Sequence, residues 1–179
     1  ELQKIRKLYS HPKCVAVGEI GLEYHYDFVP KDKQLDIFEK QIILANELEL
    51  PVIVHDREAH EDTMNLLKRY KPKGVVHCFS GSVETAYECL DLGLSFSFGG
   101  AVTFKNAKKP IEVIRSIPLE SILLETDCPY MTPVPHRGER NDPSYIGLTC
   151  EKIAEIRGMY ISEAADITYR NACKAFGIE

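Results

Sequence analysis

The sequence lacks long hydrophobic runs, paired cysteine spacing and an excess of positive charge, and each absence argues against a class of protein. No apolar run approaches the ~20 residues that a membrane-spanning helix needs, so we expect no membrane partner. The 6 cysteines show no Cys-x-x-Cys or paired spacing, which predicts reduced thiols in a cytoplasmic protein rather than a disulfide framework. The net charge of -5 argues against a broad electrostatic surface for nucleic acid but leaves a nucleic-acid substrate open.

Strands and helices are expected to alternate along the 179 residues, which are enough for a single domain over 1–179 with a sizeable core. Short apolar runs predict strands at 15–19, 51–55, 74–77, 94–98 and 122–126. Segments with apolar residues at helical spacing lie between them, and two further helices follow an irregular stretch at 128–144. This alternation is typical of parallel βαβ units in an α/β fold.

Two architectures fit five such units. They can form a small doubly wound sheet, or they can be about five of the eight units of a TIM barrel, whose usual size is ~250 residues. The sequence opens inside a helical pattern at 1–9 and has no initiator methionine. We therefore expect a partial TIM barrel, (β/α)8, whose N-terminal units are missing.

Four of the expected strands lead into groups that bind metals. Glu19 ends the first, His55 the second and His77 the third, and Asp127 follows the last. Taken alone, each has a simpler explanation, as a salt-bridged carboxylate, a helix N-cap or a hydrogen-bonded histidine. Taken together at the carboxyl ends of parallel strands, where ligands bind, they favour a divalent metal site.

Six motifs, in chain order, resemble the C-terminal two-thirds of TatD-like metal-dependent deoxyribonucleases, which belong to the amidohydrolase-like superfamily. The resemblance spans about 15–176, and the motifs are VAVGEIGLEYH, PVIVHDRE, VVHCFSG, LSFSFGGAVTFKN, LLETDCPYMTP and HRGERNDPSYI. It implies a TIM barrel with two divalent metal ions at the carboxyl ends of its strands. Mg²⁺ is the ion first expected for activity, although Zn²⁺, Mn²⁺ and Co²⁺ also suit the mixed nitrogen and oxygen ligands.

The resemblance assigns a role to each strand-end residue. It implies that Glu19 is the carboxylate bridging the metals, that His55 and His77 are further ligands, and that Asp127 is both a ligand and the general base. Glu19 and Asp127 are therefore the expected catalytic residues, and all four residues are expected metal ligands. A metal-activated water would attack the substrate.

The sequence departs from the family at its beginning. The family starts with a His-x-His pair on its first strand, and no such pair exists here, since His25 and His60 are isolated. By resemblance, the first three βα units and two metal ligands are missing. We expect the open sheet to expose its edges and to permit association with a second copy, although the oligomeric state stays open.

Basic residues near the strand ends are candidates for phosphate binding. Guanidinium groups match phosphate in a bidentate manner, so we expect contacts from the irregular stretch and from the loop after His55. A solvated loop with a surface Arg–Glu pair through Glu139 is the simpler explanation. Tyr24 and Tyr26 are expected either to stack on a base or to pack at the rim. The expected substrate-binding residues are Arg137, Arg140, Asn141 and, as a weaker candidate, Arg57.

The expected function is hydrolysis of phosphodiester bonds in DNA, as a 3′–5′ exonuclease, with RNA left open as a second substrate. The same barrel could instead hydrolyse an amide, ester or aminoacyl bond, and activity on uncharged esters would favour that hypothesis. A third hypothesis is an inactive fragment, which the absent His-x-His pair supports. Upstream sequence that encodes such a pair would restore the enzyme.

Overall fold

Five parallel strands form one sheet in the computed structural model, which describes residues 2–178 and their side chains from residue 4. The strands are β1 (Val17–Glu23), β2 (Val52–Arg57), β3 (Gly74–Val76), β4 (Leu94–Phe98) and β5 (Ile122–Leu124). Each strand pairs in parallel with the next one along the chain, so the order in the sheet equals the order in the sequence.

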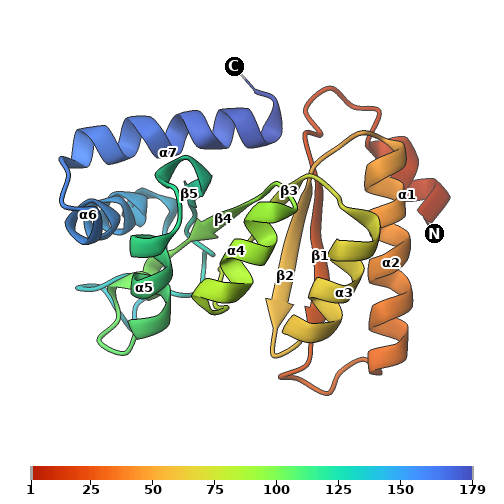
Figure 1. The fold of residues 1–179 in the computed structure, drawn as a ribbon, viewed down its shortest axis with the longest axis horizontal. Helices are drawn as coiled ribbons and strands as arrows, with labels where there is room; N and C mark the ends of the chain where they lie inside the picture. The colour runs from red at the N-terminus through yellow and green to blue at the C-terminus, as the bar shows by residue number, and fades with distance from the viewer. Residues whose placement is uncertain (1, 179) are drawn as a thin grey trace.

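A helix follows each strand, as the alternating pattern predicts (Figure 1). The helices are α1 (Leu2–Leu8), α2 (Lys31–Glu47), α3 (His60–Tyr70), α4 (Val83–Asp91), α5 (Lys108–Ser116), α6 (Ile146–Arg157) and α7 (Ile161–Phe176). Short 3-10 turns lie at η1 (Gly100–Thr103), η2 (Leu119–Ser121) and η3 (Pro143–Tyr145). None of the helices within 2–178 is both long enough and apolar enough to cross a membrane.

The strand order excludes a doubly wound sheet. Such a sheet reverses its strand order at a switch point and carries helices on both faces. Here the order runs from β1 to β5 without a reversal. Parallel crossovers share one hand, so an unreversed order places α2, α3 and α4 along the same face, where Figure 1 shows them following one another.

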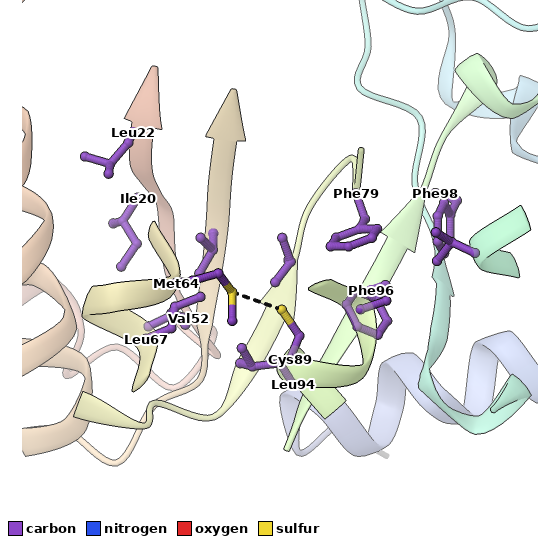
Figure 2. Packing of buried hydrophobic residues seen from close by; sticks show 14 of the residues in the cluster. Ile20, Leu22, Val52, Met64, Leu67, Phe79, Cys89, Leu94, Phe96 and Phe98 are labelled. Atoms are coloured by element: carbon purple, nitrogen blue, oxygen red, sulfur yellow. Dashed lines mark hydrogen bonds between the residues drawn. The ribbon is translucent and has the colours of Figure 1, made fainter. Parts of the chain in front are cut away.

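The core lies between that face of the sheet and the helices. Ile20, Leu22 and Val52 point from the strands into it and are buried, and Met64 and Cys89 meet them from α3 and α4 (Figure 2). The sulfur atoms of Met64 and Cys89 lie 3.5 Å apart. Because side chains alternate along a strand, this apolar face leaves the opposite face of the sheet for polar groups.

Local signals set the helix ends. Ser82 caps α4, since its side chain accepts a hydrogen bond from the backbone N–H of Thr85. Gly158 and Gly177 end α6 and α7 in the left-handed conformation that glycine adopts without strain.

Four of the five strands differ from the sequence prediction in at least one boundary, and β5 ends at Leu124 rather than at residue 126. β1 continues through Glu23, past the predicted end at Glu19, because Ile20 and Leu22 alternate into the core and extend the pairing with β2. Glu19 therefore lies inside β1 rather than at its end. β2 likewise runs past His55 to Arg57, whereas β3 ends before His77. Apolar content alone cannot locate these ends, since backbone pairing decides them.

Candidate metal centre

Three adjacent strands bring Glu19, His55 and His77 together. One carboxylate oxygen of Glu19, Oε1, lies 2.8 Å from Nδ1 of His55 and 3.5 Å from Nε2 of His77. Their ligand atoms all lie within 4.8 Å of one another. Glu19 comes from β1 and His55 from β2, and His77 directly follows β3. The strand-end pattern therefore predicts which side chains converge, even though Glu19 lies within its strand.

A glycine lets β1 and β2 come this close. Gly21 pairs with His55 in the sheet, and its φ of 151° is one that side-chain-bearing residues rarely adopt. A Cβ at Gly21 would lie 1.9 Å from the backbone oxygen of His55, which is closer than any real contact. The glycine thus fixes the separation of the two strands that carry Glu19 and His55.

The Glu19–His55 pair perturbs both groups. The hydrogen bond from His55 holds the pKa of Glu19 below its usual range, although burial opposes this effect. The same hydrogen bond raises the pKa of His55, and the Glu23 carboxylate, 3.4 Å from Nε2, adds to the effect. Both shifts favour the charged form of the group concerned, and a cation that binds a protonated imidazole nitrogen must displace its proton.

A second carboxylate, that of Glu125, orients His77 through the ring nitrogen that faces away from Glu19. Oε2 of Glu125 accepts a hydrogen bond from Nδ1 of His77 at 2.8 Å and another from the Ser97 hydroxyl. Burial is the largest single influence and disfavours the charged form of Glu125, yet the charge and hydrogen bond of His77, together with hydrogen bonds from Cys78 and Ser97, outweigh it, so the pKa of Glu125 is lowered. With Nδ1 bonded in this way, Nε2 of His77 is the nitrogen that faces Glu19 and Asp127.

Asp127 completes the cluster from the segment after β5. Its Oδ1 lies 3.9 Å from Nε2 of His77. Burial and the neighbouring carboxylates raise the pKa of Asp127, while His77 opposes the shift. Its φ of 56° is left-handed, a conformation that aspartate tolerates better than most residues.

These side chains open into one cavity of about 450 Å³. The four predicted ligands line the cavity, together with Arg57 and Cys78. Burial and the nearby Glu125 carboxylate raise the pKa of Cys78, so this thiol is protonated and is a poor nucleophile. The residues that line the cavity are Glu19, His55, Asp56, Arg57, His77, Cys78, Ser80, Asp127, Tyr130 and Met131.

The donor set fits a divalent cation. Two imidazoles and two carboxylates converge from the sheet, and such mixed nitrogen and oxygen sets suit Zn²⁺, Mn²⁺, Co²⁺ and Mg²⁺ to different degrees. Oε1 of Glu125 is buried and has no hydrogen-bond partner within the described residues. A buried carboxylate oxygen without a partner is costly, which is further reason to expect a cation or water beside it.

The predicted substrate-binding residues separate into two groups. Arg57 lines the cavity, with its Nη1 3.8 Å from Glu23. Arg137 and Arg140 do not line it, and the guanidinium of Arg137 lies over the Phe104 ring at 4.2 Å.

Asn141 is buried in the loop that follows β5. It is only 4% exposed, and its amide donates to the backbone oxygens of Thr126 and Tyr130. These bonds hold the loop after β5 in place, and a phosphate contact of Asn141 stays a prediction. The short side chain of Asn141 hydrogen-bonds to the backbone that follows β5. A sequence motif does not reveal such a contact.

Two residues of the site escaped the sequence prediction. Glu125 is the partner of His77, and Glu23 faces both His55 and Arg57. A signal for Glu125 was available, since it precedes Asp127 by two residues and so shares its side of an extended chain. Glu23 could not be found because it lies beyond the strand predicted at 15–19.

Comparison with known proteins identifies the family. The model of the "TatD related DNase" family matches residues 1–177. The uncharacterized metal-dependent hydrolase YabD of Bacillus subtilis is 50% identical, over 99% of this chain and 71% of its own length. The uncharacterized metal-dependent hydrolase YcfH of Escherichia coli K12 is 40% identical, over 100% of this chain and 69% of its own.

The fold agrees with that match. The crystal structure of YJJV, a TatD homologue from Escherichia coli K12, superposes with a TM-score of 0.93 at 34% identity. The superposition covers 99% of this chain and 70% of YJJV. The resemblance of the six sequence motifs is thereby confirmed, and the chain belongs to the TatD-related DNase family.

Proposed function

We propose that this chain carries the metal centre of a hydrolase that cleaves phosphodiester bonds in DNA as a 3′–5′ exonuclease. The name of the matching family and the names of the metal-dependent hydrolases among its relatives support this proposal. The observation that carries it is the convergence of Glu19, His55 and His77 within 4.8 Å, beside Asp127 in one cavity.

The residues of the site have separate proposed roles. Glu19, His55 and His77 would hold the cation, with Glu125 fixing the orientation of His77. When bound, divalent metal ions lower the pKa of water and neutralise charge on a phosphodiester. We assign Asp127 the role of general base. Its carboxylate faces the cavity, and its raised pKa makes it a better proton acceptor than an ordinary aspartate.

Arg57 is the cationic side chain best placed to contact a substrate phosphate, because it alone of the predicted arginines lines the cavity. Its guanidinium lies 3.8 Å from Glu23, which leaves donors available for a phosphate oxygen. Arg137 and Arg140 stay predictions as more distant contacts along a polynucleotide.

Four wider expectations belong to the same proposal. The unreversed sheet would form part of a TIM-type barrel, in which further strands pair with β1 and β5. Each of these two strands has one sheet neighbour within residues 2–178. A cytoplasmic location, RNA cleavage and association through the open sheet remain predictions.

The test is cleavage of a single-stranded oligonucleotide labelled at its 3′ or its 5′ end, with Mg²⁺ and with EDTA. We expect metal-dependent release of the 3′ label, and loss of this activity in Asp127→Ala. Asp166→Ala, an exposed aspartate of α7, is the matched control and should remain active. Metal-dependent hydrolysis of p-nitrophenyl acetate without cleavage of the oligonucleotide would favour the ester or amide alternative. A folded chain that cleaves neither would contradict the proposal for this chain.

A further inference from the structure

The loop between β1 and α2 presents two aromatic rings that the metal centre does not use. Phe28 is 84% exposed and Tyr26 is 45% exposed. Their rings are stacked, with centroids 5.2 Å apart and planes 17° apart. An exposed aromatic pair in parallel stacking is unusual for a solvated loop, because each ring would normally bury its faces.

These rings connect directly to the metal cavity through Arg57. The guanidinium carbon of Arg57 lies 5.0 Å from the centre of the Tyr26 ring, within the range of a cation–π contact. Arg57 lines the same cavity as His55 and Asp127. A row of planar groups therefore leads from the metal site through Tyr26 to Phe28 at the surface.

Glu23 joins the loop to the metal ligands. One of its oxygens, Oε2, lies 3.4 Å from Nε2 of His55 and 3.8 Å from Nη1 of Arg57. The other oxygen, Oε1, accepts hydrogen bonds from the backbone N–H groups of His25 at 2.7 Å and Tyr26 at 3.3 Å. The Glu23 carboxylate thus contacts two cavity residues, His55 and Arg57, and also holds the backbone at the start of the aromatic loop.

Gln34 fixes the rest of the loop from α2. Its side-chain oxygen accepts from the N–H of Glu23 at 2.8 Å, and its Nε2 donates to the backbone oxygens of Glu23 and Val29, each at 2.9 Å. Tyr24 is occupied elsewhere, since its hydroxyl donates to Asp62 at 2.7 Å. The loop is preorganised, so a ligand that stacks on Phe28 does not have to order it first.

We propose that Tyr26 and Phe28 form a stacking platform for a nucleobase of a single-stranded nucleic acid whose phosphate lies in the metal cavity. The proposal rests on the function proposed above and deepens it by naming the form of the substrate. Every base offers a π-face, so the platform is tolerant of sequence. A base inside a duplex is already stacked on its neighbours, so a single strand or a frayed end is the form that fits.

The first experiment compares two substrates in Phe28→Ala, Phe28→Trp and wild type. Loss of one stacked base should raise the KM for a single-stranded oligonucleotide about 5- to 150-fold with kcat little changed. Hydrolysis of bis(p-nitrophenyl) phosphate, which has no base, should not change. Phe28→Trp should retain the wild-type KM. Tyr160→Ala, which removes a ring that is 82% exposed just before α7, is the matched control and should behave as wild type.

The second experiment measures binding without turnover. An oligonucleotide with 2-aminopurine near its 3′ end, titrated in EDTA, should lose fluorescence on stacking against Phe28, and Phe28→Ala should weaken both quenching and affinity. Equal binding and equal KM in Phe28→Ala and wild type would overturn the platform, as would a lower melting temperature in Phe28→Ala with binding unchanged. If wild type hydrolyses neither substrate, the proposed function fails, and quenching that depends on Phe28 still decides the platform.

Discussion

Replacing Glu125 with glutamine isolates the contribution of charge behind a metal ligand. The substitution preserves the size of the side chain, which is 14% exposed and lies 2.8 Å from Nδ1 of His77. A hydrogen bond to a charged group contributes about 1.5–3 kcal/mol, and a neutral one about 0.5–1.5 kcal/mol. The difference is about 1–2 kcal/mol, or about 5- to 30-fold in metal affinity, close to the range for outer-shell partners of metal ligands.

Isothermal titration calorimetry with Zn²⁺ measures this difference on the chain itself. We expect Glu125→Gln to bind more weakly by the factor above and to keep its fold by circular dichroism. Glu120→Gln, an exposed glutamate of η2, is the matched control and should bind as wild type. The two variants carry the same change of net charge, so a general electrostatic effect would appear in both.

Two results would refute this reasoning. Unchanged affinity in Glu125→Gln would mean that the carboxylate does not orient His77. A loss of about 1000-fold or more would exceed what an outer-shell partner contributes. In that case Glu125 would itself be a ligand, together with His77 and Cys78, whose ligand atoms lie within 4.8 Å of it and of one another.

Three further predictions address the scaffold. Gly21→Ala should lower the free energy of unfolding by about 2–4 kcal/mol and weaken Zn²⁺ binding, because the added Cβ would meet the backbone oxygen of His55. Urea unfolding measures the first effect and a metal titration the second. Phe96→Ala should lower the free energy of unfolding by about 3–5 kcal/mol, because the ring is fully buried. An unchanged midpoint in urea unfolding would contradict this prediction. Burial and the hydrogen bond to Asp62 raise the pKa of Tyr24 from 10.0 to about 12. This stabilisation is complete below pH 10 and disappears as the pH rises through 12, so Tyr24→Phe should lack that component of alkaline destabilisation in urea unfolding.

The sequence predicted the sheet well because its strands are buried apolar runs. The prediction at 94–98 coincides with β4, since turn residues bound that run on both sides. Glu19, His55, His77 and Asp127 converge as predicted, because the carboxyl ends of parallel strands meet at one edge of a sheet. Their roles in chemistry stay predictions until an activity is measured.

The sequence could not predict how individual side chains of the site are oriented. Asn141 was expected to face a substrate, and its amide donates to the backbone after β5. Tyr24 was predicted either to stack on a base or to pack at the rim, and it contacts Asp62 and Lys31, whereas Phe28 lies exposed on the same loop. Each outcome depends on a partner distant in sequence or on a local backbone turn, and neither is encoded in apolar periodicity.

The central claim is that Glu19, His55 and His77 hold a divalent cation. Crystals soaked in Mn²⁺ and measured for anomalous scattering test it most directly. We expect a peak at about 2.0–2.3 Å from Oε1 of Glu19 and from one ring nitrogen of each histidine, a peak that Glu19→Gln weakens. Mn²⁺ bound only elsewhere on the chain, with the Glu19–His55 pair undisturbed at 2.8 Å, would contradict the claim.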